Sequence, residues 1–333
     1  MEPLLEVRNL SKTFPVSAGP LSGKRLSLKA VDGVSFALMP GETLGLVGES
    51  GSGKSTTGKL ILRLLEADAG EVLFKGENIL KRSRAGMRPL RRQLQMIFQD
   101  PYSSLNPRMR IGDIIGEPLQ IHGLAKGSAI KDEVMRLLAT VGLTQEHYYR
   151  YPHEFSGGQR QRIGIARALA VSPSLIIADE PVSALDLSIQ AQVINLLQDV
   201  QKEFGLTTLF IAHDLSVIEH ISDRVAVMYL GRLVELAPAA ALYRSPRHPY
   251  SEALLNAVPI PDPALRGRRY LMQGEIPSAI QPPAGCPFHP RCPYAHDLCH
   301  TSVPPLADKG QGHLAACHFS GEVGRHRRLL STP

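Results

Sequence analysis

The sequence has no tryptophan, only 5% aromatic residues, and no apolar run approaching the roughly 18 residues of a membrane span. Scarce aromatics leave few platforms on which single-stranded nucleic acid could stack. The N-terminal residues lack the basic stretch and apolar core of a signal peptide. The sequence therefore predicts a cytosolic protein that meets a membrane only through partners.

Charge is moderately biased, with a net value of +6 over 333 residues. Basic residues cluster at Arg91-Arg92, at 266–269 and at 325–328. Nucleic-acid binding requires such clusters to be combined with aromatic residues, which are few here. We therefore expect no nucleic-acid partner. The length of the chain allows one large domain or two ordinary ones.

A glycine-rich segment at residues 48–55 reads Gly-Glu-Ser-Gly-Ser-Gly-Lys-Ser and fits the pattern G-x-x-x-x-G-K-S. It follows the apolar run Thr43–Val47 and precedes a helical pattern from Lys54 to Leu65. Glycines let backbone N–H groups approach phosphate oxygens, and the helix points its positive end at the same anion. Lys54 should reach the β- and γ-phosphates, and Ser55 should bind Mg²⁺. The predicted phosphate-loop residues are Gly48, Ser50, Gly51, Gly53, Lys54, Ser55 and Thr56.

Two acidic residues, Asp179 and Glu180, end the apolar run Leu175–Ala178. Ligands sit at this end of the strands in parallel sheets. Asp179 is predicted to support the Mg²⁺ ion, and Glu180 to act as the base that polarises the attacking water.

The segment Ser156, Gly157, Gly158 and Gln159 begins a helical pattern that extends to Ala170. Serine is a good helix N-cap, so an ordinary cap is one interpretation. Two glycines would also let a phosphate approach the exposed N–H groups, which is the functional interpretation. The order of phosphate loop, Ser-Gly-Gly-Gln and Asp-Glu favours the second.

Strands alternate with helices along most of the chain, which predicts an α/β fold with a mostly parallel sheet. We expect a nucleotide-binding domain at 1–237, which would contain an antiparallel β subdomain and a helical insertion at about 101–158. An irregular cysteine-containing segment is expected to follow at 238–333. The expected strands are Leu4–Val7, Val34–Leu38, Leu44–Val47, Val72–Phe74, Met96–Phe98, Leu175–Ala178, Leu209–Ala212 and Val225–Met228.

Together, the three motifs resemble those of the ABC (ATP-binding cassette) ATPases over about residues 4–236. The resemblance implies that the signature Ser156–Gln159 closes over ATP held by a partner subunit. Phe155 stands where the family usually has leucine. The family also assigns roles to other positions: Phe14 would stack on adenine, Gln99 would sense Mg²⁺, the water and the membrane partner, Ser183, Ala184, Leu185 and Asp186 would link the two sites, and His213 would contact the γ-phosphate and orient Glu180.

Three further segments, Pro101–Arg108, Tyr151–Phe155 and Pro246–Tyr250, resemble the oligopeptide/dipeptide importer ATPases, most closely the F-type subunit. This implies ATP-driven peptide import at the cytoplasmic face of the membrane. The implied partners are a second, non-identical ATPase, two membrane permeases and an extracytoplasmic binding protein. An importer of nickel or another small solute, and a soluble ABC protein without a transport role, are the alternatives.

All four cysteines, Cys286, Cys292, Cys299 and Cys317, lie in the last part of the chain. A reducing cytosol argues against disulfides, and the C-x₂₋₄-C pairs typical of zinc sites are absent. Four thiolates suit an iron–sulfur cluster, and in some related importer ATPases a similar tail holds [4Fe–4S]. Zinc, helped by neighbouring histidines, and unligated thiols stay open. Because the tail is far in sequence from Lys54 and Glu180, we expect a cluster to fold the tail and leave nucleotide binding largely intact.

Overall fold

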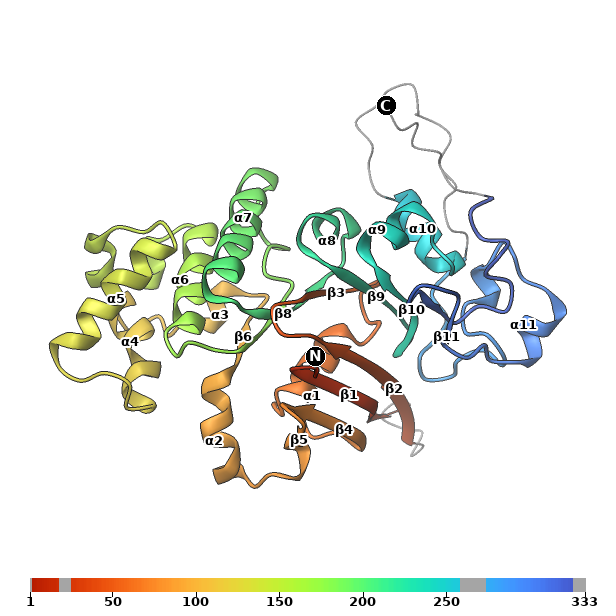
Figure 1. Ribbon diagram of the computed structural model, residues 1–333, viewed down its shortest axis with the longest axis horizontal. Coiled ribbons are helices and arrows are strands. Elements are labelled where there is room, and N and C mark those ends of the chain that lie inside the picture. The colour runs from red at the N-terminus through yellow and green to blue at the C-terminus, as the bar shows by residue number, and fades with distance from the viewer. Residues whose placement is uncertain (1, 18–24, 258–273, 326–333) are drawn as a thin grey trace.

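The computed structural model describes residues 2–17, 25–257 and 274–325. In these ranges the chain forms a large mixed sheet, a smaller antiparallel sheet, a helical lobe at one end and a C-terminal extension at the other (Figure 1). The basic cluster at 266–269, and that at 325–328 apart from Arg325, lie outside the described residues.

The larger sheet carries the strands that lead to the glycine-rich loop and the acidic pair. Five neighbouring strands run parallel, as the alternation of strands and helices predicts, and three antiparallel strands extend one edge. The spatial order is β11 (Ala307–Asp308), β12 (Leu314–Ala315), β10 (Arg232–Pro238), β9 (Arg224–Tyr229), β3 (Thr43–Val47), β8 (Thr207–Ala212), β7 (Leu175–Asp179) and β6 (Leu94–Ile97).

The smaller sheet is antiparallel, in the order β2 (Arg25–Leu38), β1 (Leu5–Ser17), β4 (Ala69–Phe74) and β5 (Glu77–Asn78). The expected strands Leu4–Val7 and Val34–Leu38 are only the ends of the long β1–β2 pair. Register shifts between Val7 and Thr13 interrupt the alternation of side chains along this pair. The alternation of apolar and polar residues is therefore lost in this part of the pair, although β1 and β2 remain paired beyond it.

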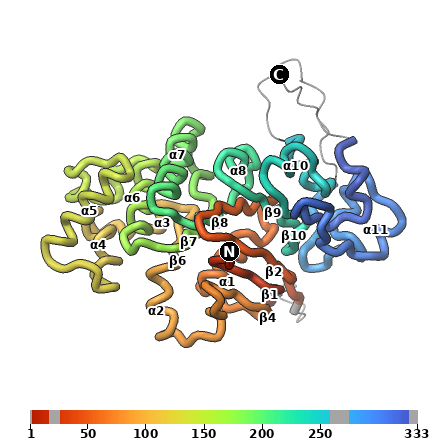
Figure 2. Tube along the Cα trace, in the orientation of Figure 1, coloured from red at the N-terminus to blue at the C-terminus, as the bar shows by residue number. Residues whose placement is uncertain are grey.

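The α-helices are α1 (Lys54–Ile61), α2 (Arg84–Gln93), α3 (Pro101–Ser104), α4 (Ile111–Ile121), α5 (Ser128–Thr140), α6 (Gly157–Leu169), α7 (Leu187–Phe204), α8 (Leu215–Ile221), α9 (Ala239–Arg244), α10 (Pro249–Ala257) and α11 (Asp297–Thr301). Single 3₁₀ turns are η1 (Ile79–Lys81), η2 (Gln145–Tyr149), η3 (Pro152–Glu154) and η5 (His289–Arg291). Helices α4 and α5 lie in the segment predicted as an insertion, and both pack against α6, which begins at its end, as the chain trace also shows (Figure 2). Helix α1 ends four residues earlier than expected, because Arg63 adopts a positive φ of 52° that a right-handed helix excludes.

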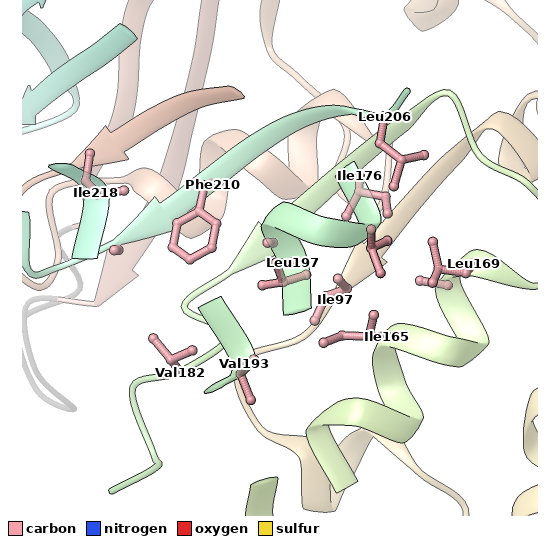
Figure 3. Packing of buried hydrophobic residues seen from close by; sticks show 14 of the residues in the cluster. Ile97, Ile165, Leu169, Ile176, Val182, Val193, Leu197, Leu206, Phe210 and Ile218 are labelled. Atoms are coloured by element: carbon pink, nitrogen blue, oxygen red, sulfur yellow. The ribbon is translucent and has the colours of Figure 1, made fainter. Parts of the chain in front are cut away.

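Buried side chains cover both faces of the larger sheet. Along β7 and β8, Ile176 and Phe210 belong to the cluster that includes α6 and α7, whereas Ile177 and Leu209 belong to the cluster that includes α1 and the smaller sheet. Figure 3 shows the helix-side cluster, in which Ile165 and Leu169 of α6 approach Ile97 and Ile176. The central strands are therefore fixed from both sides, and the loops at their carboxyl ends start from rigid positions.

The extension is more regular than its proline content predicts. After β10 it forms α9 and α10, and later α11 and the β11–β12 hairpin, in which Leu314 of β12 pairs with Leu236 of β10. Tyr250 and Phe288 are fully or almost fully buried among residues of the core. Burial of these aromatic rings supplies the free energy that orders the segment.

In the described ranges, no helix combines the length and the apolar character that crossing a membrane requires.

Candidate functional site

Predicted site residues from separate parts of the chain line one pocket of about 430 Å³. The pocket lies where β3, β7 and β8 end, as expected for a parallel sheet. Leu28, Ala30 and Ala279 also line it, the last from the extension. The predicted residues in the lining are Phe14, Ser50, Gly51, Gly53, Lys54, Ser55, Thr56, Gln99, Glu180 and His213.

Two glycines of the phosphate loop cannot be replaced without displacing backbone. Gly48 and Gly53 have φ angles of 155° and 103°. A Cβ at Gly48 would lie 2.2 Å from the Met228 carbonyl oxygen, and one at Gly53 would lie 2.1 Å from that of Ala30. The loop is therefore packed against β2 and β9, and its N–H groups are held in place for an anion.

Lys54, the first residue of α1, is 4% exposed. Its Nζ donates to the carbonyl oxygens of Gly48, at 2.7 Å, and Glu49, at 3.0 Å. Burial lowers the pKa of Lys54, whereas the nearby carboxylates of Glu180, Asp179 and Glu49 raise it. An ammonium group has three donors, so one is left for an entering phosphate oxygen.

Ser55 and Asp179 form the part of the site that could hold Mg²⁺. The Ser55 hydroxyl donates to Asp179 Oδ1 at 2.6 Å. Burial raises the pKa of Asp179, and the Ser55 hydrogen bond partly opposes this. A hydroxyl and a carboxylate are the hard oxygen donors that Mg²⁺ prefers, so these residues fit the predicted ion.

The carboxylate of Glu180 is the point on which two other predicted residues converge. Gln99 Nε2 donates to Glu180 Oε2 at 2.9 Å, and His213 Nδ1 lies 3.5 Å from the same oxygen. The Glu180 backbone has a positive φ of 46°, and its N–H donates to the Ile211 carbonyl oxygen at 3.0 Å. This uncommon conformation after β7 turns the carboxylate into the pocket.

The predicted signature Ser156–Gln159 is not part of this lining. Ser156 is exposed and caps α6: Gln159 N–H donates to Ser156 Oγ, and Ser156 N–H donates to Gln159 Oε1. The loop Ser183–Asp186 lies beside it, since a Cβ on Gly157 would be 3.3 Å from Leu185 Cδ2. Phe155 is 5% exposed in the helical core, which accounts for a large apolar residue there.

Sequence reasoning did not identify a contact between the phosphate loop and the extension. It joins Glu49 of the loop to Tyr250 of α10 and Arg291 of η5. Glu49 occupies one of the variable positions of the motif, and the other two belong to the extension. The segment Pro246–Tyr250 indicated the resemblance to importer ATPases, but its residues predict no contact with the phosphate loop.

In the described part of the structure, the four cysteines do not form a metal site. Among the described residues, which include all four, no group of three or more His, Cys, Asp or Glu side chains is placed to hold a metal ion. Cys286 and Cys299 are buried and the other two half-buried. Burial raises the pKa of Cys292 to about 12 and of Cys317 to about 11, and backbone N–H groups two residues ahead oppose the shift. The donor chemistry suits thiolate ligands, but the observed arrangement does not support the iron–sulfur or zinc prediction.

Comparisons with known proteins match both parts of the chain. Residues 31–183 match the family described as ABC transporter, and residues 234–299 match the oligopeptide/dipeptide transporter C-terminal region. The chain is 52% identical to the oligopeptide transport ATP-binding protein AppF of Bacillus subtilis over 321 residues, covering 96% of this chain and 98% of that protein. It is 53% identical to the putative oligopeptide transport ATP-binding protein YkfD of the same organism, covering 95% of each chain.

Two solved structures share the fold. The ATP-binding cassette MJ0796, a dimer bound to ADP and Pi, aligns with a TM-score of 0.63 at 26% identity, covering 71% of this chain and 98% of that one. The protein cbiO1 of Clostridium perfringens, part of the transporter complex cbiONQ, aligns with a TM-score of 0.62 at 26% identity, covering 73% and 92%.

Proposed function

Since this chain belongs to the family of ATP-binding subunits of ABC transporters, we propose that it hydrolyses ATP to power the import of dipeptides or oligopeptides. The observation that carries the proposal is the single pocket in which Lys54, Ser55, Gln99, Glu180 and His213 meet. The similarity of residues 234–299 to the C-terminal region of oligopeptide/dipeptide transporters supports the peptide as cargo.

In the proposed mechanism, the triphosphate enters the phosphate loop and takes the free donor of Lys54. Ser55 and Gln99 would hold a Mg²⁺ ion, with Asp179 orienting the Ser55 hydroxyl, and the ion would supply positive charge next to the phosphates. Glu180 accepts a proton from the attacking water, while His213 contacts the γ-phosphate and, like Gln99, orients Glu180 at its Oε2 oxygen. Phe14, in the lining of the same pocket, stacks on adenine. Catalysis is then mostly positioning and electrostatics, as in phosphoryl transfer generally.

A second ATPase subunit completes each site. Ser156 is exposed and is the N-cap of α6, so we propose that it approaches the γ-phosphate held by a partner. Gly157 and Gln159, which are half-buried, lie next to Ser156 in the first turn of α6, whereas Gly158 is buried against Ile189. The segment Ser183–Asp186 connects this turn to Glu180 through Ser183, whose N–H donates to the Glu180 carbonyl oxygen. We propose a non-identical partner, as in the F-type subunits that the sequence resembles.

The membrane partners are two permeases, and an extracytoplasmic binding protein delivers the solute. A groove of about 620 Å³ is lined by residues of α2, β6, α3 and α4, together with the exposed side chains of Leu64, which follows α1, and Phe98, which precedes Gln99. We propose that a short cytoplasmic segment of a permease docks in this groove and that its movement is passed to Glu180 through Gln99, whose Nε2 donates to Glu180 Oε2. The chain would thus work at the cytoplasmic face of the membrane.

For the cysteines we keep the [4Fe–4S] proposal, with zinc as the alternative. Its support is the confinement of all four cysteines to the extension and the backbone N–H groups directed at three of the sulfurs. Protein purified without oxygen should contain close to four irons per chain, with absorption that is lost on oxidation. One equivalent of zinc and no iron in such a preparation would contradict the cluster and favour a zinc site.

The transport proposal is tested by reconstitution of the chain with its permeases and partner ATPase in vesicles. A peptide-loaded binding protein should stimulate phosphate release and peptide uptake, and Lys54→Ala should abolish both. If a nickel complex stimulates hydrolysis and peptides do not, the transported solute is nickel and not a peptide. ATP hydrolysis that responds to neither would contradict the role in import.

A further inference from the structure

The C-terminal extension contacts the back of the phosphate loop at Glu49, the second residue of the motif. The guanidinium of Arg291 donates two hydrogen bonds to the Glu49 carboxylate, at 2.8 and 2.9 Å. The backbone N–H of Glu49 donates to the Tyr250 hydroxyl at 2.7 Å. Both the side chain and the main chain of one loop residue are therefore held by residues more than 200 positions away.

The groups that hold Glu49 are themselves fixed by packing. The Arg291 side chain is only 6% exposed, and Tyr250 is completely buried. The rings of Tyr250, Tyr229 and Phe288 pack with centroids 4.7 to 5.5 Å apart. Arg291 lies over Tyr229, 6.0 Å from its centroid. A guanidinium confined in this way offers the carboxylate one bidentate geometry.

The charge of Glu49 makes this contact relevant to nucleotide. The side chain belongs to the residue between Gly48 and Ser50, and its carbonyl oxygen accepts a hydrogen bond from Lys54 Nζ. A free carboxylate there would repel a triphosphate and would attract the Lys54 ammonium away from it. Arg291 neutralises the carboxylate and keeps it on the side of the loop that faces the extension.

We propose that Arg291 and Tyr250 are positioning residues through which the C-terminal extension sets the affinity of the phosphate loop for ATP. The inference rests on the proposed function, in that the pocket must bind nucleotide. Arg291 acts by removing the charge of Glu49 from the site, and Tyr250 acts by fixing the main chain of the loop. The extension is thus a structural part of the nucleotide site.

The test combines single and double substitutions in the full chain. Arg291→Ala should raise the Kd of a non-hydrolysable ATP analogue by about tenfold. The Glu49 carboxylate would then lack its cation and would repel the phosphates of the analogue. Glu49→Ala alone and Glu49→Ala combined with Arg291→Ala should bind the analogue with the same affinity, because the loss caused by Arg291→Ala depends on the Glu49 carboxylate. Arg291→Lys should recover part of the loss, since it restores the charge without the fork.

Two further measurements separate positioning from folding. Added salt should shrink the Arg291→Ala defect, because it screens the exposed charge. In the assembled transporter the defect should appear in KM for ATP with kcat nearly unchanged. The matched control is Arg136→Ala, which breaks a similar bidentate pair with Glu133 on α5 and should leave nucleotide affinity unchanged.

The outcomes are distinguishable. If the unsubstituted chain binds no nucleotide, the proposed function fails and not the positioning role alone. If the double variant binds as weakly as Arg291→Ala, then Arg291 acts only by folding the extension and the inference is overturned. Unchanged affinity in Arg291→Ala overturns it as well.

Discussion

Replacing Glu180 by glutamine tests which group activates the attacking water. The change keeps the shape of the side chain and removes its charge and its capacity to take a proton. Glu180 Oε2 has Gln99 Nε2 at 2.9 Å and His213 Nδ1 at 3.5 Å, and the side chain is 15% exposed, so packing is nearly conserved. Loss of a positioned general base is worth about 10²–10⁴-fold in kcat, or roughly 3–5 kcal/mol in the barrier.

The assay is single-turnover phosphate release from the transporter assembled with its partners, alongside the Kd for ATP. Affinity should be unchanged or slightly higher, because one negative charge near the γ-phosphate is gone. The control is Glu203→Gln, an exposed change on α7 with the same chemistry. Phosphate release at the unsubstituted rate in Glu180→Gln would refute the assignment of the base.

Other outcomes follow from the same geometry. Ser156→Arg should block hydrolysis at the partner's phosphate loop while nucleotide still binds at Lys54; ATP-driven dimerisation that survives unchanged would contradict the composite site. Tyr250→Phe should lower the free energy of unfolding by about 1–3 kcal/mol, because the Glu49 N–H loses its acceptor, and thermal unfolding at an unchanged Tm would count against this. The isolated chain should show only weak ATPase activity, and strong activity in a strict monomer would argue that one subunit suffices.

Local motifs made most of the nucleotide pocket predictable. The glycine-rich loop, the acidic strand end and the residue His213 each follow an apolar strand, and parallel strands bring such ends to one edge. The structure confirms the α/β class and the mostly parallel sheet. It also brings Gln99 and Phe14 into the same lining, although only the family resemblance had singled them out.

The remaining features depend on contacts that no local pattern encodes. The length of the β1–β2 pair was missed because register shifts break its alternation. The regular elements of the extension were missed because Tyr250 and Phe288 become ordered only through burial against the core. The signature gives no sign of its role within one chain, since its predicted ligand belongs to another subunit.

The expectation that the tail leaves nucleotide binding intact was based on sequence distance, and the structure contradicts that basis. Cys292 directly follows Arg291, and Arg291 binds Glu49 of the phosphate loop across 242 positions. Cys286 begins the preceding turn, where its backbone carbonyl accepts the His289 N–H. Because Arg291 and Cys292 are adjacent in the chain, we expect a change that displaces Cys292 to displace Arg291 as well. A change such as Cys292→Ser should weaken nucleotide binding to the extent that it displaces Arg291, and adding Glu49→Ala should remove that part of the loss.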